Sequence, residues 1–96
     1  WGADSWICGP ANCMAKAVCD LERTFRSGDL KKAKQIMVRL WPAMNILESG
    51  KFVQKLKFGC ELQGTPVGEC RMPFGPLSDE EKAAFAEAMQ PIIQWK

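Results

Sequence analysis

The apolar residues of the chain recur mainly at spacings of three and four, the pattern of helices that bury one face. In the first such segment the apolar positions are Met14, Val18, Leu21 and Phe25. The same spacing predicts helices over about residues 12–26, 30–47, 52–63 and 79–90. The chain is therefore expected to be mainly α-helical, with about four helices.

Residues that favour helix ends separate these segments. Gly28 suits the left-handed position after the first helix, and Asp29 can cap the second. Because this link is short, the first two helices are expected to form an antiparallel hairpin. Ser78 and Glu81 match a capping box at the start of the last helix.

Other glycines and prolines predict irregular backbone. Pro42 is expected to kink the second helix, and Pro91 is expected to kink or close the fourth. Gly59, inside the third helix, indicates close packing or a weak point. Three prolines and two glycines over residues 65–77 predict an extended crossing between the third and fourth helices.

The beginning of the chain differs from the rest. Residues 5–8 are apolar and β-compatible, and Gly9-Pro10 follows as a stop signal, which predicts a short strand. The lack of alternation suits a strand buried on both faces of a parallel sheet. A lone strand leaves its backbone groups without partners. Since the chain also starts with Trp1, we interpret it as a piece of a longer protein that supplies the neighbouring strands.

Composition restricts the functional classes. With 96 residues, 47% of them hydrophobic and 25% charged, the chain has the composition of a soluble globular domain. It has no apolar run long enough to cross a bilayer, so we expect no membrane association and a cytoplasmic location. The net charge of +2 is too small to indicate nucleic acid binding. The chain has no histidine, the usual general base and the commonest metal ligand.

Two residue types could suggest chemistry of their own. The five cysteines are Cys8, Cys13, Cys19, Cys60 and Cys70. Their number is odd and they form no C-x-x-C pair, so buried, reduced thiols are expected rather than a thiolate metal site. A lysine in an apolar pocket can form a Schiff base. The cluster of Lys51, Lys55 and Lys57 is interpreted instead as a solvated helical face.

The turn between the predicted strand and the first helix is the candidate ligand site. In parallel α/β folds, ligands bind at the carboxyl ends of the strands. The candidate substrate-binding residues are therefore Cys8, Gly9, Pro10 and Asn12.

Several short motifs occur in a specific order along the whole chain. They are Gly2-Ala3-Asp4, Ile7, Ala11-Asn12, Gly28-Asp29, Ala33, Leu40-Trp41-Pro42, Lys57, Leu62, Gly64, Arg71-Met72-Pro73-Phe74 and Pro76-Leu77-Ser78. The last two are the most specific. In this set and order the chain resembles the C-terminal third of the dihydrodipicolinate synthase / N-acetylneuraminate lyase family.

The resemblance implies an α/β parent protein, a TIM (β/α)8 barrel followed by a C-terminal helical domain. Residues 1–27 would then be the last strand and closing helix of the barrel, and residues 28–96 the helical region. Family members are lyases in which a lysine on the sixth strand forms a Schiff base with pyruvate or a related 2-oxo acid, and a tyrosine relays protons. Lys57 matches a lysine of the helical region instead.

The same resemblance implies a limited role for this chain. The catalytic lysine and tyrosine would lie outside it, so we expect no catalytic residue here and no activity of the isolated chain. Cys8, Gly9, Pro10 and Asn12 would shape the pocket wall. No cofactor or metal is expected. The expected partners are a 2-oxo acid substrate and either the missing barrel or further copies in a homo-oligomer.

Some features leave alternatives open. Two departures from the synthase pattern, at residues 51–56 and at Gly9-Pro10, favour the hydratase-aldolase or sugar-acid dehydratase branches. An alternative function is a free-standing helical module that docks a partner through its Trp and Met faces. A cysteine-based redox or metal protein is a third alternative.

Overall fold

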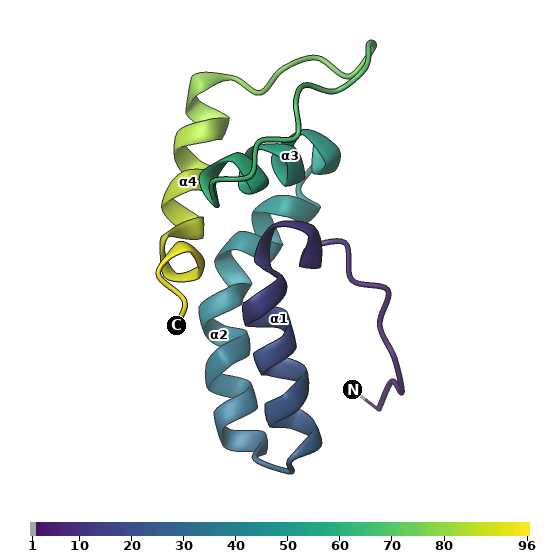
Figure 1. Cartoon of the computed structure of the whole chain (residues 1–96), viewed down its shortest axis with the longest axis vertical. Coiled ribbons are helices and arrows are strands. Elements are labelled where there is room, and N and C mark those ends of the chain that lie inside the picture. The colour runs from purple at the N-terminus through teal and green to yellow at the C-terminus, as the bar shows by residue number, and fades with distance from the viewer. Residues whose placement is uncertain (1) are drawn as a thin grey trace.

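The computed structural model describes residues 2–96 as a four-helix arrangement. The helices are α1 (Ala11–Arg26), α2 (Leu30–Glu48), α3 (Phe52–Leu62) and α4 (Asp79–Ile93). Figure 1 shows α1 and α2 as a long hairpin, with α3 across one end of it and α4 beside that end of α2. The predicted number and order of helices are confirmed. Among these residues, no helix is both long enough and apolar enough to cross a membrane.

The strand predicted over residues 5–8 is not formed. Residues 2–96 contain no strand, and the segment before α1 runs along the outside of the hairpin (Figure 1). Ile7 is fully exposed and Trp6 is more than half exposed. Strand geometry is held by hydrogen bonds to a neighbouring strand. Because the described residues supply no such neighbour, the prediction is wrong for the chain as it stands.

The turn between α1 and α2 forms as predicted. Gly28 has a φ of 84°, the left-handed conformation that glycine adopts without steric cost. The Oδ1 atom of Asp29 accepts a hydrogen bond of 3.0 Å from the backbone N–H of Lys32, which caps α2. Arg23 and Arg26 lie in the last turn of α1, where cations interact favourably with the helix dipole.

Near its beginning, the backbone of α1 departs from helical geometry, and side chains of α3 bind the carbonyls beside this break. Met14 has φ −144° and ψ 39°, outside the helical range. On the amino-terminal side of this break, two backbone carbonyls accept hydrogen bonds from α3. The Cys60 thiol donates to the oxygen of Asn12 at 3.3 Å, and Gln63 Nε2 donates to the oxygen of Cys13 at 3.1 Å. The side chains of α3 thereby hold the first turn of α1 in place.

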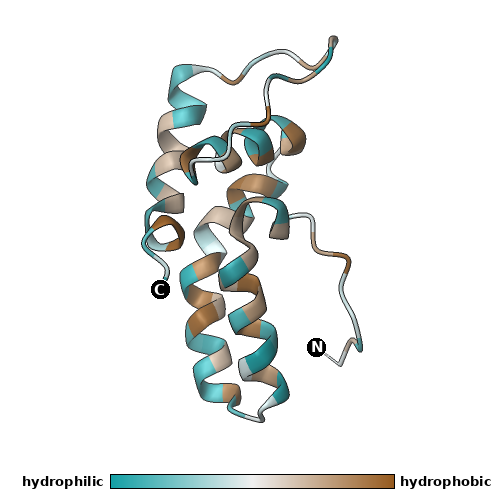
Figure 2. Cartoon of the chain, in the orientation of Figure 1, coloured by the Kyte–Doolittle hydropathy of each residue, from teal (hydrophilic) through white to brown (hydrophobic). Residues whose placement is uncertain are grey.

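The core lies where α1, α2 and α4 meet. Its buried members are Cys13, Met14, Ala17, Val18, Ile36, Leu40, Ala43, Met44, Leu47, Phe85, Met89 and Ile92. Half-buried residues of α3, among them Phe58, pack against this cluster. Figure 2 shows apolar and hydrophilic residues interspersed along the helices, as expected where each helix buries one face.

Neither proline within a helix ends that helix. α2 continues through Pro42 as one helix, and α4 runs to Ile93, past both Pro91 and the predicted end at residue 90. A proline ring has a φ that suits a helix, so its main cost is the missing donor and local crowding. Tertiary packing compensates for this cost, because Leu40, Ala43 and Ile92 are buried on the same helices.

The segment between α3 and α4 is an extended crossing, as predicted. Side chains of α3 hold it by its backbone: Lys57 Nζ donates to the oxygen of Glu69 at 3.0 Å, and Gln54 Nε2 donates to that of Gly75 at 3.3 Å. At its end Leu77 is buried. The crossing therefore follows a defined path over the third helix.

Gly59 lets α3 approach α1 closely. A Cβ atom at this position would lie 2.8 Å from Cys13 Cβ and 2.9 Å from its Sγ atom. Gly59→Ala is expected to lower the free energy of unfolding by about 1–2 kcal/mol, because overpacking outweighs the better helix propensity of alanine. Urea unfolding would measure the change. Gly75→Ala is the matched control, since nothing lies within 4 Å of its Cβ position; equal losses in both variants would contradict close packing at Gly59.

The start of α4 is held by a capping box that also binds α3. Glu81 Oε2 accepts from the backbone N–H of Ser78 at 2.8 Å, and Ser78 Oγ accepts from that of Glu81 at 3.1 Å. Lys51 Nζ lies 2.9 Å from the Glu81 carboxylate. The Lys51 ammonium, followed by the Ser78 N–H, holds the pKa of the Glu81 carboxyl below its ordinary value of 4.5.

This lowered pKa makes the fold sensitive to acid. The ionised carboxylate stabilises the folded chain above pH 4.5, and the contribution is lost as the pH falls through the lowered folded value. Glu81→Gln should therefore reduce the loss of stability between about pH 7 and pH 3, measured by urea unfolding. Glu87→Gln, a change of an exposed residue on the same helix, is the control. An unchanged acid dependence in Glu81→Gln would show that this carboxylate is not responsible.

Candidate functional site

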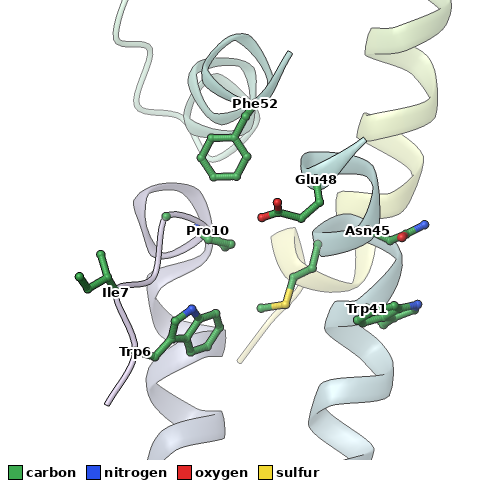
Figure 3. Close-up of a pocket in the computed structure, with 9 residues that line it drawn as sticks. Trp6, Ile7, Pro10, Trp41, Asn45, Glu48 and Phe52 are labelled. Carbon is green, nitrogen blue, oxygen red and sulfur yellow. The ribbon is translucent and has the colours of Figure 1, made fainter. Parts of the chain in front are cut away.

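The Gly9-Pro10 turn faces the last turns of α2 across a groove of about 490 Å³ (Figure 3). Its lining residues are Trp6, Ile7, Gly9, Pro10, Trp41, Met44, Asn45, Glu48 and Phe52. Most of these side chains are apolar, and Glu48 is the one ionisable residue among them. In Figure 3 the Glu48 carboxylate points towards Pro10 and Phe52.

The structure divides the four predicted substrate-binding residues. Gly9 and Pro10 line the groove. Cys8 packs against the core cluster. The Asn12 side chain turns back on the chain, where its Nδ2 atom donates a hydrogen bond of 2.8 Å to the backbone oxygen of Gly9. A role of these residues in shaping a substrate pocket stays a prediction, and only Gly9 and Pro10 face the groove in this arrangement.

Phe52, at the start of α3, fixes the position of the turn. A Cβ atom on Gly9 would lie 2.6 Å from the Cζ atom of Phe52, so only glycine allows the ring to lie this close. Sequence reasoning did not identify Phe52, Met44 or Glu48 as neighbours of the turn. Each was expected within a helix, and no local spacing indicates which turn of a distant helix meets residue 9.

The cysteines near the turn are poor nucleophiles. Burial, with a smaller contribution from the nearby Cys60 thiol, raises the pKa of Cys13 to about 12. Burial likewise raises the pKa of Cys8. A thiol reacts as the thiolate, and the raised pKa values keep both groups mainly in the less reactive thiol form near neutral pH. Within residues 2–96, no three His, Cys, Asp or Glu side chains are placed to hold a metal ion together.

Lys55 corrects the interpretation of the lysine cluster as a solvated face. It is only 6% exposed, and its Nζ atom donates to the backbone oxygen of Ile46 at 2.7 Å and to Ser49 Oγ at 3.0 Å. These oxygens lie at the carboxyl end of α2, where free carbonyls and the helix dipole favour a cation. Lys55 is therefore a cap supplied to α2 by α3.

The other two lysines of the cluster are also occupied at a distance from the groove. Lys57 donates a hydrogen bond to the backbone oxygen of Glu69, and Lys51 donates one to the carboxylate of Glu81. None of the three lysines lines the groove. The apolar lining and the Glu48 carboxylate make the groove suited to an apolar or cationic group. Among the described residues, the groove presents no amine or activated thiol that could attack a substrate.

Removing the Lys55 cap should destabilise the chain. Lys55→Met keeps the length and the apolar stem of the side chain but removes the donor to Ile46 and Ser49. The free energy of unfolding is expected to fall by about 1–3 kcal/mol, the cost of losing charge-assisted hydrogen bonds at a buried site. Thermal or urea unfolding measures this loss. Lys32→Met, at an exposed position of α2, should change stability by less than about 0.5 kcal/mol; similar losses in the two variants would argue against the cap.

Comparison with known proteins gives an independent result. The chain matches the dihydrodipicolinate synthetase family over residues 1–92. It is 33% identical over 89 residues to the 4-hydroxy-tetrahydrodipicolinate synthase of Trichlorobacter lovleyi, which covers 93% of this chain and 31% of the relative. The enzyme of the same name from Geobacter sulfurreducens is 34% identical over 91 residues, again 93% of this chain and 31% of the relative.

A third relative agrees with these two. The 4-hydroxy-tetrahydrodipicolinate synthase of Acidiphilium cryptum is 30% identical over 79 residues, or 82% of this chain and 27% of the relative. The chain thus spans less than a third of the length of the relatives that it matches. Because the family match extends over nearly the whole chain, as the ordered motifs had predicted, this protein belongs to the dihydrodipicolinate synthetase family.

Proposed function

We propose that the chain serves as the C-terminal helical part of a lyase that binds pyruvate or a related 2-oxo acid as a lysine Schiff base. The observation that carries this proposal is a family match over residues 1–92 by a chain that spans only about 31% of its relatives. The reacting lysine then belongs to a part of the longer protein that this chain does not include. The chain contributes structure and assembly, and no reacting group.

The exposed segment before α1 supports the proposal that a barrel belongs to the longer protein. Trp6 and Ile7 are apolar and largely exposed, and no neighbouring strand accompanies them in residues 2–96. As the last strand of a parallel barrel, residues 5–8 would bury these side chains and satisfy their backbone groups. In this proposal α1 is the closing barrel helix, and residues 28–96 form the appended helical region.

The environment of the lysines supports the proposal that the Schiff-base lysine lies outside this chain. A Schiff-base lysine needs a free amine at the substrate. The ammonium of Lys55 is bound to two oxygens under α2, and that of Lys57 to the oxygen of Glu69. At the carboxyl end of the proposed strand, Cys8, Gly9, Pro10 and Asn12 would form part of the pocket wall.

The two departures from the synthase pattern touch each other in the structure. One is Gly9-Pro10 and the other is the segment 51–56, and Phe52 of that segment packs directly on Gly9. They are therefore one coupled change at the carboxyl end of the proposed strand. We propose that this change alters the second substrate, in the direction of hydratase-aldolase or sugar-acid dehydratase chemistry. The alternative, a free-standing interaction module, does not account for the family match.

Borohydride trapping tests the proposal. In a chimera, this chain replaces the matching segment of the Geobacter sulfurreducens synthase. The chimera is incubated with pyruvate, and borohydride then reduces the lysine Schiff base to a stable amine. We expect a stable adduct whose peptide lies outside the transplanted 96 residues. The isolated chain, treated in the same way, should keep its mass. A pyruvate adduct on any lysine of this chain, in either sample, would overturn the assignment of the chemistry to the missing part.

A further inference from the structure

The groove beside Gly9-Pro10 lies at the level where the barrel of the proposed function would open. α1 begins at Ala11, directly after the proposed strand, and leads away from the carboxyl end of that strand. α2 runs back along α1, so its last turn and Phe52, the first residue of α3, return to Gly9-Pro10 (Figure 1, Figure 3). Substrates of such barrels bind at the carboxyl ends of the strands. The groove is therefore placed to contact the part of a substrate that projects from the barrel.

One side of this groove is fixed by the packing of the helices. The ring of Phe52 lies directly on Gly9, and Met44 is buried in the core. The Lys55 ammonium binds oxygens at the end of α2, which ties Glu48 and its neighbours to α3. Because these contacts join α1, α2 and α3, this side of the groove does not require a particular path of residues 5–8.

The polar groups of the groove disfavour a sugar acid. The Glu48 carboxylate is exposed and takes part in no ion pair within residues 2–96. No lysine or arginine of these residues lines the groove, so a substrate carboxylate would meet repulsion without a compensating cation. The neutral polar side-chain groups of the lining are the Asn45 amide and the indole N–H groups of Trp6 and Trp41. Most hydroxyls of a sugar acid would therefore lose water without gaining a partner.

The apolar part of the lining suits a flat ring. The Phe52 ring faces the groove in Figure 3, and Met44 also lines it. Aromatic rings and thioethers both make favourable contacts with a further aromatic ring. The volume of about 490 Å³ lies within the usual range of roughly 300–1,000 Å³ for small-molecule sites.

We propose that this groove binds the side group of the second substrate and selects an uncharged, apolar group, such as the aromatic ring of an aldehyde. In the reaction, the carbon next to the pyruvate Schiff base loses a proton and adds to the aldehyde carbon. One C–C bond forms, and the aldehyde oxygen takes up a proton. The inference rests on the proposed function for this reaction, and it favours hydratase-aldolase over sugar-acid dehydratase chemistry. Phe52 and Glu48 determine specificity and do not touch the reacting atoms.

Binding to the full 96-residue chain tests the lining directly. Amide NMR spectra are recorded during titration with benzyl alcohol, benzoate or gluconate, and the shifted signals should include Gly9 and Phe52. Benzyl alcohol is expected to bind at least about tenfold more tightly than gluconate, and about threefold more tightly than benzoate because of the Glu48 charge. Glu48→Gln should remove the preference over benzoate. Glu87→Gln, at an exposed position of α4, is the matched control and should keep it.

Three results of these titrations would overturn the proposal. They are the absence of benzyl alcohol binding, equal binding of benzyl alcohol and gluconate, and a preference over benzoate that survives Glu48→Gln. Glu48 is exposed at the end of α2, where the helix dipole disfavours an anion, so its replacement by glutamine should not impair folding.

Turnover by the chimera with the Geobacter sulfurreducens synthase supplies the second readout. Its kcat/KM for addition of pyruvate to benzaldehyde, relative to D-glyceraldehyde, should exceed that of the unmodified synthase several-fold. Glu48→Gln in the chimera should raise the relative kcat/KM for 4-carboxybenzaldehyde. A chimera that traps pyruvate without these changes would overturn this inference alone. Pyruvate trapped on a lysine of this chain would overturn the proposed function, whereas the titrations would still decide what the groove binds.

Discussion

The approach of α3 to α1 at Gly59 is the constraint on which the rest of the structure depends. Cys13 occupies the space that a side chain at Gly59 would need. With the helices this close, Cys60 and Gln63 reach the carbonyls left free at the break in α1. The same placement of α3 sets Phe52 on Gly9, and Lys55 under the end of α2. One short helix thereby joins the turn, the hairpin and the crossing segment.

This arrangement places the molecule's own lysines and cysteines in structural roles. Lys55 closes a helix end, and the Cys60 thiol donates to a backbone oxygen. The exposed apolar residues include Trp6 and Ile7, in the segment before α1. In the proposed function, this segment faces a sheet contributed by the remainder of a family member. A chain that spans under a third of its relatives agrees with that proposal.

Local patterns in the sequence predicted the helices, because the determinants are local. The capping contacts of Asp29 and Ser78, and the left-handed Gly28, need only neighbours within a few residues. The strand failed because its partners are other strands. The burial of Lys55 was missed because a lysine is apolar along its stem, and only the tertiary structure reveals whether its ammonium reaches oxygens at a helix end. Of the candidate site, the Gly9-Pro10 turn was predicted, whereas Phe52 and Glu48 reach it only through the packing of α2 and α3.

The burial of Lys55 also has a consequence for chemical labelling. It is the one charged residue in the buried set, and its Nζ atom is held by two oxygens. Amine-reactive reagents require an accessible, deprotonated lysine, so Lys55 is shielded while α3 remains seated on α2. Acylation at this position in a pulse-labelling experiment would then report how often the third helix detaches. Lysines on the exposed side of α2, such as Lys32, provide the internal reference for reagent activity.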